Sequence, residues 1–584
     1  MKTLVFDIET DGIDPNNIWC ISTVNADTDE AISYGPDRLV DGVQYLKSAD
    51  KLVGHNIIGY DIPVIKKLMD VDLSKHAKIV DTLVLSRLFN PVREGGHSLE
   101  SWGYRVGHRK IEFEEFATFT PEMLKYCEND TLLNQKVFNT LKIESSGFSS
   151  RAVGLEHTAS KIMTDQRSHG FLLDVEKATM LVAELSERLY EVETLVHETF
   201  LPRKVKTVLK ATFTKSGALS KMAAIQGSIK KSRLTQEEYD DIAVKRVITR
   251  INEEPFNLGS RKQIGEYLID FGWEPKKFTP TGQPIVDEGT LSKIKDIPEA
   301  KLIAEYLLLQ KRIAQLTSWI KEVHDDNRVR GFVNPNGTIT GRMTHNSPNM
   351  AQCPSVRSPY GKECRECWTV PEGYKLVGID ASGLELRMLA HYMDDEAYTN
   401  EILHGDIHTT NQKLAGLESR DQSKTFIYAL IYGAGNAKLG QVVGGNKEDG
   451  ERLRRRFLDN LPSFKNLRDR VARASTKGYV KGLDGRKLYI RSEHAALNTL
   501  LQGAGAIVMK EAMSILYNKI TENKLDAHFV CNVHDEWQIE VRECDADAVG
   551  IAGIESIKEA GLTLELRCPL TGEYNVGSNW AETH

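Results

Sequence analysis

The sequence predicts an α/β domain at the N-terminus followed by a larger α+β region. The first segment, KTLVFDIET, is an apolar run typical of a buried strand. Two alternating apolar runs, His528 to Val533 and Trp537 to Val541, predict a β-hairpin near the C-terminus. Between these parts lie two long helical patterns, Glu176 to His197 and Glu299 to Val323. At 584 residues, the chain has room for roughly three or four domains.

Composition excludes several classes of protein. No stretch approaches the ~20 consecutive apolar residues of a membrane helix, and the polar, acidic N-terminus does not resemble a secretion signal. Eight cysteines in so long a chain predict reduced thiols in the cytoplasm rather than a disulfide framework. Cys364 and Cys367 have a C-x-x-C spacing without a second pair, which favours surface thiols over a zinc site. The net charge of −7 requires that any polyanion meet a locally basic surface.

Two aspartates are placed where neighbouring strands would bring them together. Asp380 ends the apolar run Lys375 to Ile379, and Asp535 lies at the turn of the predicted hairpin. Carboxylates suit Mg²⁺, and two Mg²⁺ ions roughly 3.5–4 Å apart stabilise the attacking and leaving oxygens of a nucleotidyl transfer. A lone Asp at a strand end is usually a cap or turn residue. The pair in these contexts favours a metal site.

The segment RDQSKTFIYALIYGAG predicts a helix with a functional stripe. Steps of four residues place Arg420, Lys424, Tyr428 and Tyr432 on one slowly turning face. A triphosphate would lie along the two cations and a base near Tyr428, and His408 in the preceding GDIHTT could add a phosphate donor. An amphipathic helix with a solvated basic edge is the commoner explanation of such a stripe, but it does not account for the flanking carboxylates.

The N-terminal region carries a second set of acidic residues. Asp7 and Glu9 are two residues apart on the predicted strand and so face one side of the sheet. Asp61 closes the segment HNIIGYD, and YCEND places Tyr126 and Asp130 on one helical face. Four carboxylates and a tyrosine suit a two-metal phosphodiester hydrolase in which the tyrosine orients water. A strand with merely exposed acids would explain DIET alone, but not three motifs in order.

Six segments resemble the motifs of family A DNA polymerases, in particular the replicative enzymes of short-tailed phages of the T-seven type. They are TGRMTHNSPNMAQ (340–352), DASGLELR (380–387), RDQSKTFIYALIYGAG (420–435), LDGRK (483–487), LNTLLQGAGA (497–506) and VHDE (533–536). The N-terminal motifs resemble the 3′→5′ proofreading exonucleases of the DnaQ-like class. This resemblance implies an exonuclease domain with an RNase H-like mixed sheet, followed by a right-hand polymerase. The expected bounds are 1–148 for the exonuclease, 149–330 for the thumb, 331–400 and 485–584 for the palm, and 401–484 for the fingers.

The resemblance also implies roles for individual residues. In the polymerase site, two Mg²⁺ ions would be bound by Asp380, Asp535 and the backbone carbonyl of Ala381. In the exonuclease site, two divalent ions, Mg²⁺ or Mn²⁺, would be bound by Asp7, Glu9, Asp61 and Asp130, beside Tyr126. The triphosphate would be held by His408, Arg420 and Lys424. The expected DNA contacts are Tyr432 near the template base, Arg342 and Gln502 in the minor groove, and His534 near the primer end.

Two positions bear on the choice of nucleotide. Glu385 lies five residues after Asp380, where the family places a gate that crowds a ribose 2′-OH and so favours deoxynucleotides. Tyr428 resembles the tyrosine of family members that accept chain-terminating dideoxynucleotides. We therefore expect efficient dideoxynucleotide incorporation.

A basic stretch lies between the two long helical patterns. From Leu201 to Arg233 there are nine Lys or Arg residues and no Asp or Glu. In the phage enzymes that the chain resembles, an insert at this place captures host thioredoxin, but residues 201–257 do not show that insert's sequence. A DNA-holding arm is the favoured interpretation. A site for another partner and a solvated loop are the alternatives.

The expected partners are primer–template DNA and deoxynucleoside triphosphates, with a replicative helicase–primase as a further candidate and no membrane. The expected setting is the cytoplasm of an infected bacterium. The chain begins at the exonuclease motif, so no 5′-nuclease activity is expected. Two other functions have less support. A single-subunit RNA polymerase is disfavoured by Glu385 and the exonuclease motifs, and a non-catalytic DNA-binding scaffold is disfavoured because the expected metal ligands are all present.

Overall fold

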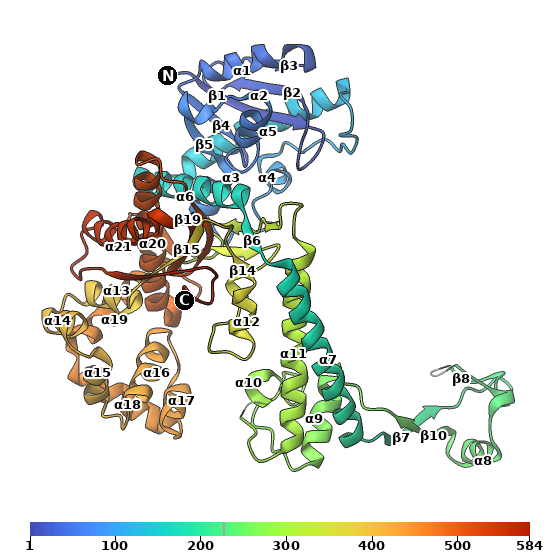
Figure 1. The fold of residues 1–584 in the computed structure, drawn as a ribbon. Helices are drawn as coiled ribbons and strands as arrows, with labels where there is room; N and C mark the ends of the chain where they lie inside the picture. Colours follow the sequence, from blue (N-terminus) through green and yellow to red (C-terminus); the bar gives the residue numbers. More distant parts are fainter. Residues whose placement is uncertain (226–227, 292) are drawn as a thin grey trace. The chain divides into compact units, whose positions relative to one another are not determined.

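The computed structural model describes residues 1–225, 228–291 and 293–584 (Figure 1). The chain forms two compact units, and each is described by itself. The larger unit consists of Met1–Val175 together with Lys321–His584, and the smaller is Glu176–Ile320. Within the described ranges, no helix has the length and apolar character needed to cross a lipid bilayer.

A five-stranded mixed sheet forms the N-terminal part of the larger unit, in the order β3-β2-β1-β4-β5. Its strands are β1 (Thr3–Thr10), β2 (Ile18–Asn25), β3 (Ala31–Tyr34), β4 (Lys51–Gly54) and β5 (Lys78–Asp81). β1 is antiparallel to β2 and parallel to β4. Leu4 and Phe6 enter one hydrophobic core, and Val5 enters the core on the opposite face. Because strand side chains alternate, Asp7 and Glu9 share the face of Val5, as predicted.

Helices cover both faces of this sheet (Figure 1). Residues of α1 (Leu39–Lys47) and α2 (Asp61–Met69) contribute to the core that contains Leu4. Residues of α3 (Thr82–Phe89), α4 (Leu99–Val106) and α5 (Pro121–Glu144) contribute to the core that contains Val5. The sequence of α5 includes the YCEND motif, so its residues lie against the face that carries Asp7 and Glu9.

Helix α6 (Ser150–His169) follows α5 and reaches back to the first domain through His157. The Asp81 backbone N–H donates to Nε2 of His157 at 2.9 Å. The Asp81 carboxylate in turn accepts from the backbone N–H groups of Asn56 and Ile58, at 3.0 and 3.1 Å. These contacts fix the HNIIGYD segment that leads to Asp61.

A second sheet, antiparallel and four-stranded, has the order β18-β19-β15-β20. Its strands are β15 (Tyr374–Ala381), β18 (Ala527–Val533), β19 (Glu536–Arg542) and β20 (Gly572–Gly577). The hairpin predicted from the two alternating runs is confirmed as β18 and β19, and Asp380 pairs in register with Glu536 of β19. Residues of α20 (Ala496–Glu522) and α21 (Ala546–Thr563) join the hydrophobic core beside this sheet.

Several helices precede or follow β15 in the sequence. They are α12 (Gly361–Glu366), which precedes it, and α13 (Leu384–Met393), α14 (Glu396–His404), α15 (Ile407–Ala415), α16 (Arg420–Ile431), α17 (Asn436–Gly440), α18 (Lys447–Asn460) and α19 (Pro462–Ser475), which follow it. The predicted helix with the cationic stripe is α16. Ser419 and Gln422 form a capping box at its start, and Tyr432 lies at its C-cap, one residue beyond the helix. The stripe therefore extends past the end of the helix.

In the smaller unit, the two predicted long helices are confirmed as α7 (Val175–Thr199) and α11 (Pro298–Lys321). They run side by side (Figure 1), joined by an ion pair of 2.8 Å between Arg188 Nε and Glu305 Oε1. The short helices α9 (Arg261–Asp270) and α10 (Glu288–Leu291) precede α11 in the chain.

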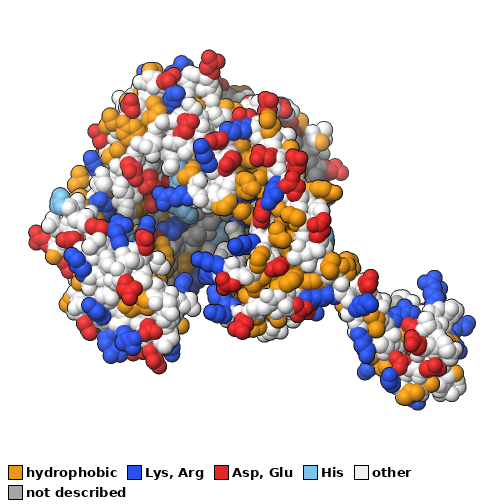
Figure 2. All heavy atoms as spheres, turned by 60° about the horizontal axis from the view of Figure 1, so that its bottom comes forward, with side chains coloured by type: hydrophobic (Ala, Val, Ile, Leu, Met, Phe, Trp, Pro, Cys, Tyr) orange, Lys and Arg blue, Asp and Glu red, His pale blue; other side chains and the backbone are white. Residues whose placement is uncertain are grey.

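The basic stretch belongs to a small folded module rather than to a loop. β7 (Arg203–Lys210) pairs along its length with β10 (Val247–Glu254), and α8 (Gln236–Lys245) packs with a small core that includes Ile242 and Ile248. Eight of the nine predicted basic residues are exposed, and Arg203 pairs with Asp270. Lys and Arg side chains are spread over the visible face of the module at the lower right of Figure 2, together with acidic residues.

The prediction of surface thiols at the C-x-x-C spacing is wrong. Cys364 and Cys367 are both 0 % exposed, at α12 and just after it. Their spacing follows the helical period, which turns both side chains toward the interior.

Candidate active sites

The structure brings Asp380 and Asp535 to one end of the second sheet. Asp380 lies in β15 just before its last residue, and Asp535 lies between β18 and β19. The Ala381 N–H donates to the backbone oxygen of Asp535 at 3.1 Å, which holds the two segments together. Burial and the neighbouring Asp535 raise the pKa of Asp380 to about 7. Burial also raises the pKa of Asp535. Such a pair of crowded carboxylates is suited to a divalent cation.

Both aspartates line a cavity of about 440 Å³. Predicted site residues gather around it: Arg342, Asp380, Ala381, Glu385, Tyr428, Tyr432, His534 and Asp535. His408, Arg420, Lys424 and Gln502 are not among its lining residues. The carboxylate end and the aromatic end of the predicted site are therefore joined in one space. The cationic end of α16 lies outside this cavity.

Glu385 is held between two other predicted residues. Its Oε1 lies 3.1 Å from Nη2 of Arg342. The Tyr432 hydroxyl donates to the two carboxylate oxygens at 2.8 and 2.7 Å. Burial and this hydrogen bond raise the pKa of Tyr432. Sequence reasoning assigned separate roles to the three residues and missed their mutual bonding.

The cationic end of the stripe is exposed to solvent. Arg420 Nε pairs with Asp406 at 2.8 Å, and Lys424 is exposed one turn further along α16. Burial and the charges of these two cations lower the pKa of His408, whose ring centroid lies 6.4 Å from that of Tyr428. The rings of Tyr428 and Tyr432 lie 6.3 Å apart at 30°. The order of cations and then rings along α16 is as predicted, while the Asp406 partner was missed.

At the first sheet, Asp7 and Glu9 approach each other beside Cys127. One potential ligand atom from each of the three lies within 4.8 Å of the others. Asp61, at the start of α2, accepts from the Ile8 N–H at 3.3 Å. Burial raises the pKa of Asp7 well above its usual value, and the charges of Glu9, Asp61 and Asp130 raise it further. The structure thus unites the four predicted carboxylates, and Cys127 of α5 is an addition that sequence reasoning missed.

These carboxylates are crowded and largely withdrawn from water. Asp61 and Asp130 are each 3 % exposed, and Glu9 is 9 % exposed. Burial raises the pKa of Glu9 to about 9 and that of Asp61 to about 7. A cluster of this kind releases its protons when cations bind, and hard oxygen ligands suit Mg²⁺ or Mn²⁺. The donor set therefore fits divalent metals.

The side chain of Lys110 contacts this carboxylate cluster directly. Lys110 Nζ lies 2.6 Å from Asp130 Oδ2 and 4.9 Å from the centroid of the Tyr126 ring. The Asp130 carboxylate raises the pKa of Lys110 against the opposing effect of burial. Lys110 lies in the irregular segment between α4 and α5, so no helical or strand period in the sequence marks it. Tyr126 and Asp130 do share one face of α5, as predicted.

Comparison with known proteins identifies the family to which the chain belongs. The model of DNA polymerase family A matches residues 228–582, and that of the RNase_H superfamily matches residues 4–101. The chain belongs to DNA polymerase family A. It is a DNA-directed DNA polymerase with an RNase H-like domain at its N-terminus, so the expected fold class is confirmed.

Similar proteins include two phage polymerases. The DNA-directed DNA polymerase of Escherichia phage T7 is 33% identical over 709 aligned residues, covering 100% of both chains. That of Enterobacteria phage T3 is 34% identical over 658 residues, covering 92% of this chain and 93% of the other. A solved structure, the POL domain of Pol1 from M. smegmatis in complex with DNA primer-template and dNTP, has a TM-score of 0.76 at 18% identity. The match covers 99% of this family A chain and 95% of the other, and it shows the fold alone.

Proposed function

We propose that this polymerase extends a DNA primer at the cavity shared by Asp380 and Asp535. The observation that carries the proposal is the convergence of these carboxylates with Glu385, Tyr428 and Arg342 around one space. Asp380, Asp535 and the carbonyl of Ala381 would hold two Mg²⁺ ions. When bound, the ions stabilise negative charge on the attacking and leaving oxygens of the nucleotidyl transfer.

The incoming deoxynucleotide would lie along α16. Arg420, Lys424 and His408 would bind the triphosphate, and Tyr428 would support the base and sugar. Arg420 donates from Nε to Asp406, so a triphosphate would either bind its other guanidinium N–H groups or exchange with that carboxylate. The exposure of both partners means that this exchange costs little free energy.

The nascent base pair would be shaped by Glu385 and Tyr432. Glu385 would crowd a ribose 2′-OH, and Tyr432 would lie near the template base. Since the Tyr432 hydroxyl is bonded to Glu385, entry of a template base at this place requires that the bond be broken or shifted. Arg342 and Gln502 would contact the minor groove, and His534 would lie beside the primer end.

We further propose that the RNase H-like domain is a 3′→5′ proofreading exonuclease. Asp7, Glu9, Asp61 and Asp130 would hold two divalent ions, Mg²⁺ or Mn²⁺, and Tyr126 would orient the attacking water. The burial and crowding of these carboxylates support the assignment. A mispaired primer end would separate from its template and be hydrolysed here.

We assign residues 1–148 to the exonuclease, 149–330 to the thumb, 331–400 and 485–584 to the palm, and 401–484 to the fingers. Residues 201–257 would form a DNA-holding arm. The folded core and exposed basic residues of this module support such an arm over a solvated loop. Host thioredoxin and a replicative helicase–primase are candidate partners.

A primer-extension assay with Mg²⁺ tests the central proposal. Wild-type protein is expected to extend a primer–template with four deoxynucleotides, and Asp380→Ala is expected to abolish extension. Running both with and without added thioredoxin shows whether the arm acts alone. Full extension by Asp380→Ala would show that the reaction occurs elsewhere.

A further inference from the structure

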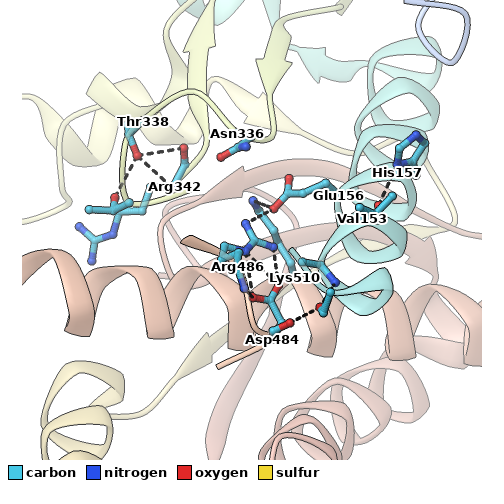
Figure 3. A network of polar contacts seen from close by, with 12 residues as sticks. Val153, Glu156, His157, Asn336, Thr338, Arg342, Asp484, Arg486 and Lys510 are labelled. Atoms are coloured by element: carbon cyan, nitrogen blue, oxygen red, sulfur yellow. Dashed lines mark hydrogen bonds and ion pairs between the residues drawn. The ribbon is translucent and has the colours of Figure 1, made fainter. Parts of the chain in front are cut away.

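A buried charge cluster (Figure 3) adjoins the polymerase cavity, which one of its members, Lys510, lines. It consists of Glu156 on α6, Asp484 and Arg486 between β16 (Tyr479–Lys481) and β17 (Lys487–Tyr489), and Lys510 on α20. Each of the four side chains is 2 % exposed or less. Two acids and two bases leave the cluster with no net charge.

The bonds of the cluster join three separate segments. Glu156 Oε1 accepts from Lys510 Nζ at 2.6 Å and also from Arg486 Nη1. Arg486 donates from Nε and Nη2 to Asp484 Oδ2, at 2.9 and 2.7 Å. The planar guanidinium fork imposes directions on these bonds, so the cluster fixes α6, the β16–β17 connection and α20 against one another.

The cluster also meets the turn at 336–342, which has no regular secondary structure of its own. At Gly341, where φ is +75°, a Cβ atom would lie 3.2 Å from Arg486 Nη1 and 3.9 Å from Lys510 Nζ. The turn is closed internally because the Arg342 N–H donates to Thr338 Oγ1 at 3.0 Å. Figure 3 shows the turn above the cluster, with the Arg342 guanidinium directed away from it.

We propose that Lys510 is a positioning residue that, with Glu156 and Arg486, holds this turn and thereby places Arg342 for its contact with the primer minor groove. Lys510, Gly341 and Arg342 all line the cavity that contains Asp380 and Asp535. A buried ion pair contributes little net stability compared with an apolar replacement, whereas the guanidinium fork of Arg486 gives this cluster fixed directions. The inference rests on the proposed role of Arg342.

The test compares primers that end in adenine or in 3-deazaadenine, which lacks the minor-groove N3 acceptor. Loss of a hydrogen bond to a charged group is expected to slow single-turnover extension by wild-type enzyme about tenfold to hundredfold. Arg342→Met should extend both primers equally slowly. If wild-type enzyme extends both primers at the same rate, or Arg342→Met still extends them at different rates, the proposed role of Arg342 is wrong. The inference about Lys510 is then wrong too.

The double variant Glu156→Gln/Lys510→Met then tests Lys510, since it keeps the cluster electrically neutral. It should lose most of the sensitivity to 3-deazaadenine. Lys519→Met is the matched control, because Lys519 lies on the same helix and pairs at the surface with Glu559. It should keep the wild-type response. A folded double variant with the wild-type response would overturn the inference while leaving the role of Arg342 intact.

Thermal unfolding shows whether the double variant is folded. If it is not, Glu156→Gln alone provides the test, because it preserves the volume of the side chain and one acceptor oxygen for Lys510. It should lower the 3-deazaadenine effect severalfold, and Lys510→Arg should retain more of the response than Lys510→Met. An undiminished effect in folded Glu156→Gln would contradict the proposal.

Discussion

The chain holds two clusters of carboxylates that differ in how their charge is balanced. At the polymerase cavity, two aspartates lie at strand ends, and Arg342, a cation that lines the same cavity, is bonded to Glu385 rather than to either of them. At the RNase H-like domain, four carboxylates are crowded together, and Lys110 enters the cluster itself. At the first site the charge of Arg342 acts on Asp535 without a bond to it, whereas at the second Lys110 is bonded directly to Asp130.

This difference follows from where the residues come from. Asp380 and Asp535 line an open cavity of about 440 Å³, so water and ions can reach them. Glu9, Asp61 and Asp130 are drawn from a strand and two helices into a buried position, where burial raises the pKa of each and the charges of Asp130 and Asp61 raise that of Glu9 further. A tethered ammonium reduces that repulsion before any metal binds.

The largest expected effect separates the two sites completely. Asp380→Ala should lower primer extension on the order of 10³-fold or more, because a metal ligand contributes several kcal/mol of transition-state stabilisation. It should leave degradation of single-stranded DNA unchanged. Asp7→Ala with Glu9→Ala should abolish degradation and spare extension. Joint loss of both activities in either variant would mean that the sites are not independent.

Lys110 allows a direct test of the difference in charge balance. Lys110→Met should lower the Mn²⁺ concentration needed to fill the exonuclease site, by about tenfold, since the metal no longer displaces an ammonium from Asp130. Mn²⁺ binding followed by electron paramagnetic resonance measures this without relying on activity. Lys125→Met, at an exposed position of α5, is the control. A higher Mn²⁺ requirement would show that Lys110 assists the metal rather than competing with it.

A substitution at Tyr428 tests how the polymerase cavity selects the sugar of the incoming nucleotide. The wild-type enzyme should incorporate dideoxynucleotides efficiently, and Tyr428→Phe should discriminate against them by about tenfold more, because one hydroxyl is removed. Termination products on a sequencing gel give the ratio, with total extension by deoxynucleotides as the control. Equal termination by both proteins would remove Tyr428 from sugar selection.

The smallest effect concerns the basic module. Replacing three exposed lysines of β7 by glutamine should reduce the salt slope of DNA binding by about 0.9 for each phosphate that the protein no longer neutralises. The substituted residues are Lys204, Lys206 and Lys210. Three exposed lysines of the larger unit, changed in the same way, serve as the control: Lys75, Lys142 and Lys558. An unchanged slope would favour a protein partner for this module.

The sequence predicted those features that depend on local periodicity. Asp7 and Glu9 share a strand face, Tyr126 and Asp130 share a helix face, and the hairpin at Asp535 follows from alternation alone. The long helices of the smaller unit were predicted for the same reason. Contacts between residues that do not share a helix or strand face depend instead on the tertiary path of the chain.

Contacts made by irregular segments could not be predicted. Lys110 lies in an irregular segment, and only tertiary folding brings it to Asp130. The bond between Tyr432 and Glu385 joins residues 47 positions apart. The strands and the core of the module at 201–257 were not predicted, because the core is small and the strands are mostly exposed, which leaves no strong alternation to detect.

Helix α6 has a consequence for recombining such enzymes. Its consecutive residues Glu156 and His157 diverge by about 100° around the helix axis, one toward the charge cluster and one toward Asp81. A single inserted residue upstream of this pair would rotate both from their partners. Chimaeras that exchange the nuclease of one polymerase for that of another should therefore carry α6 and its partners from the same parent.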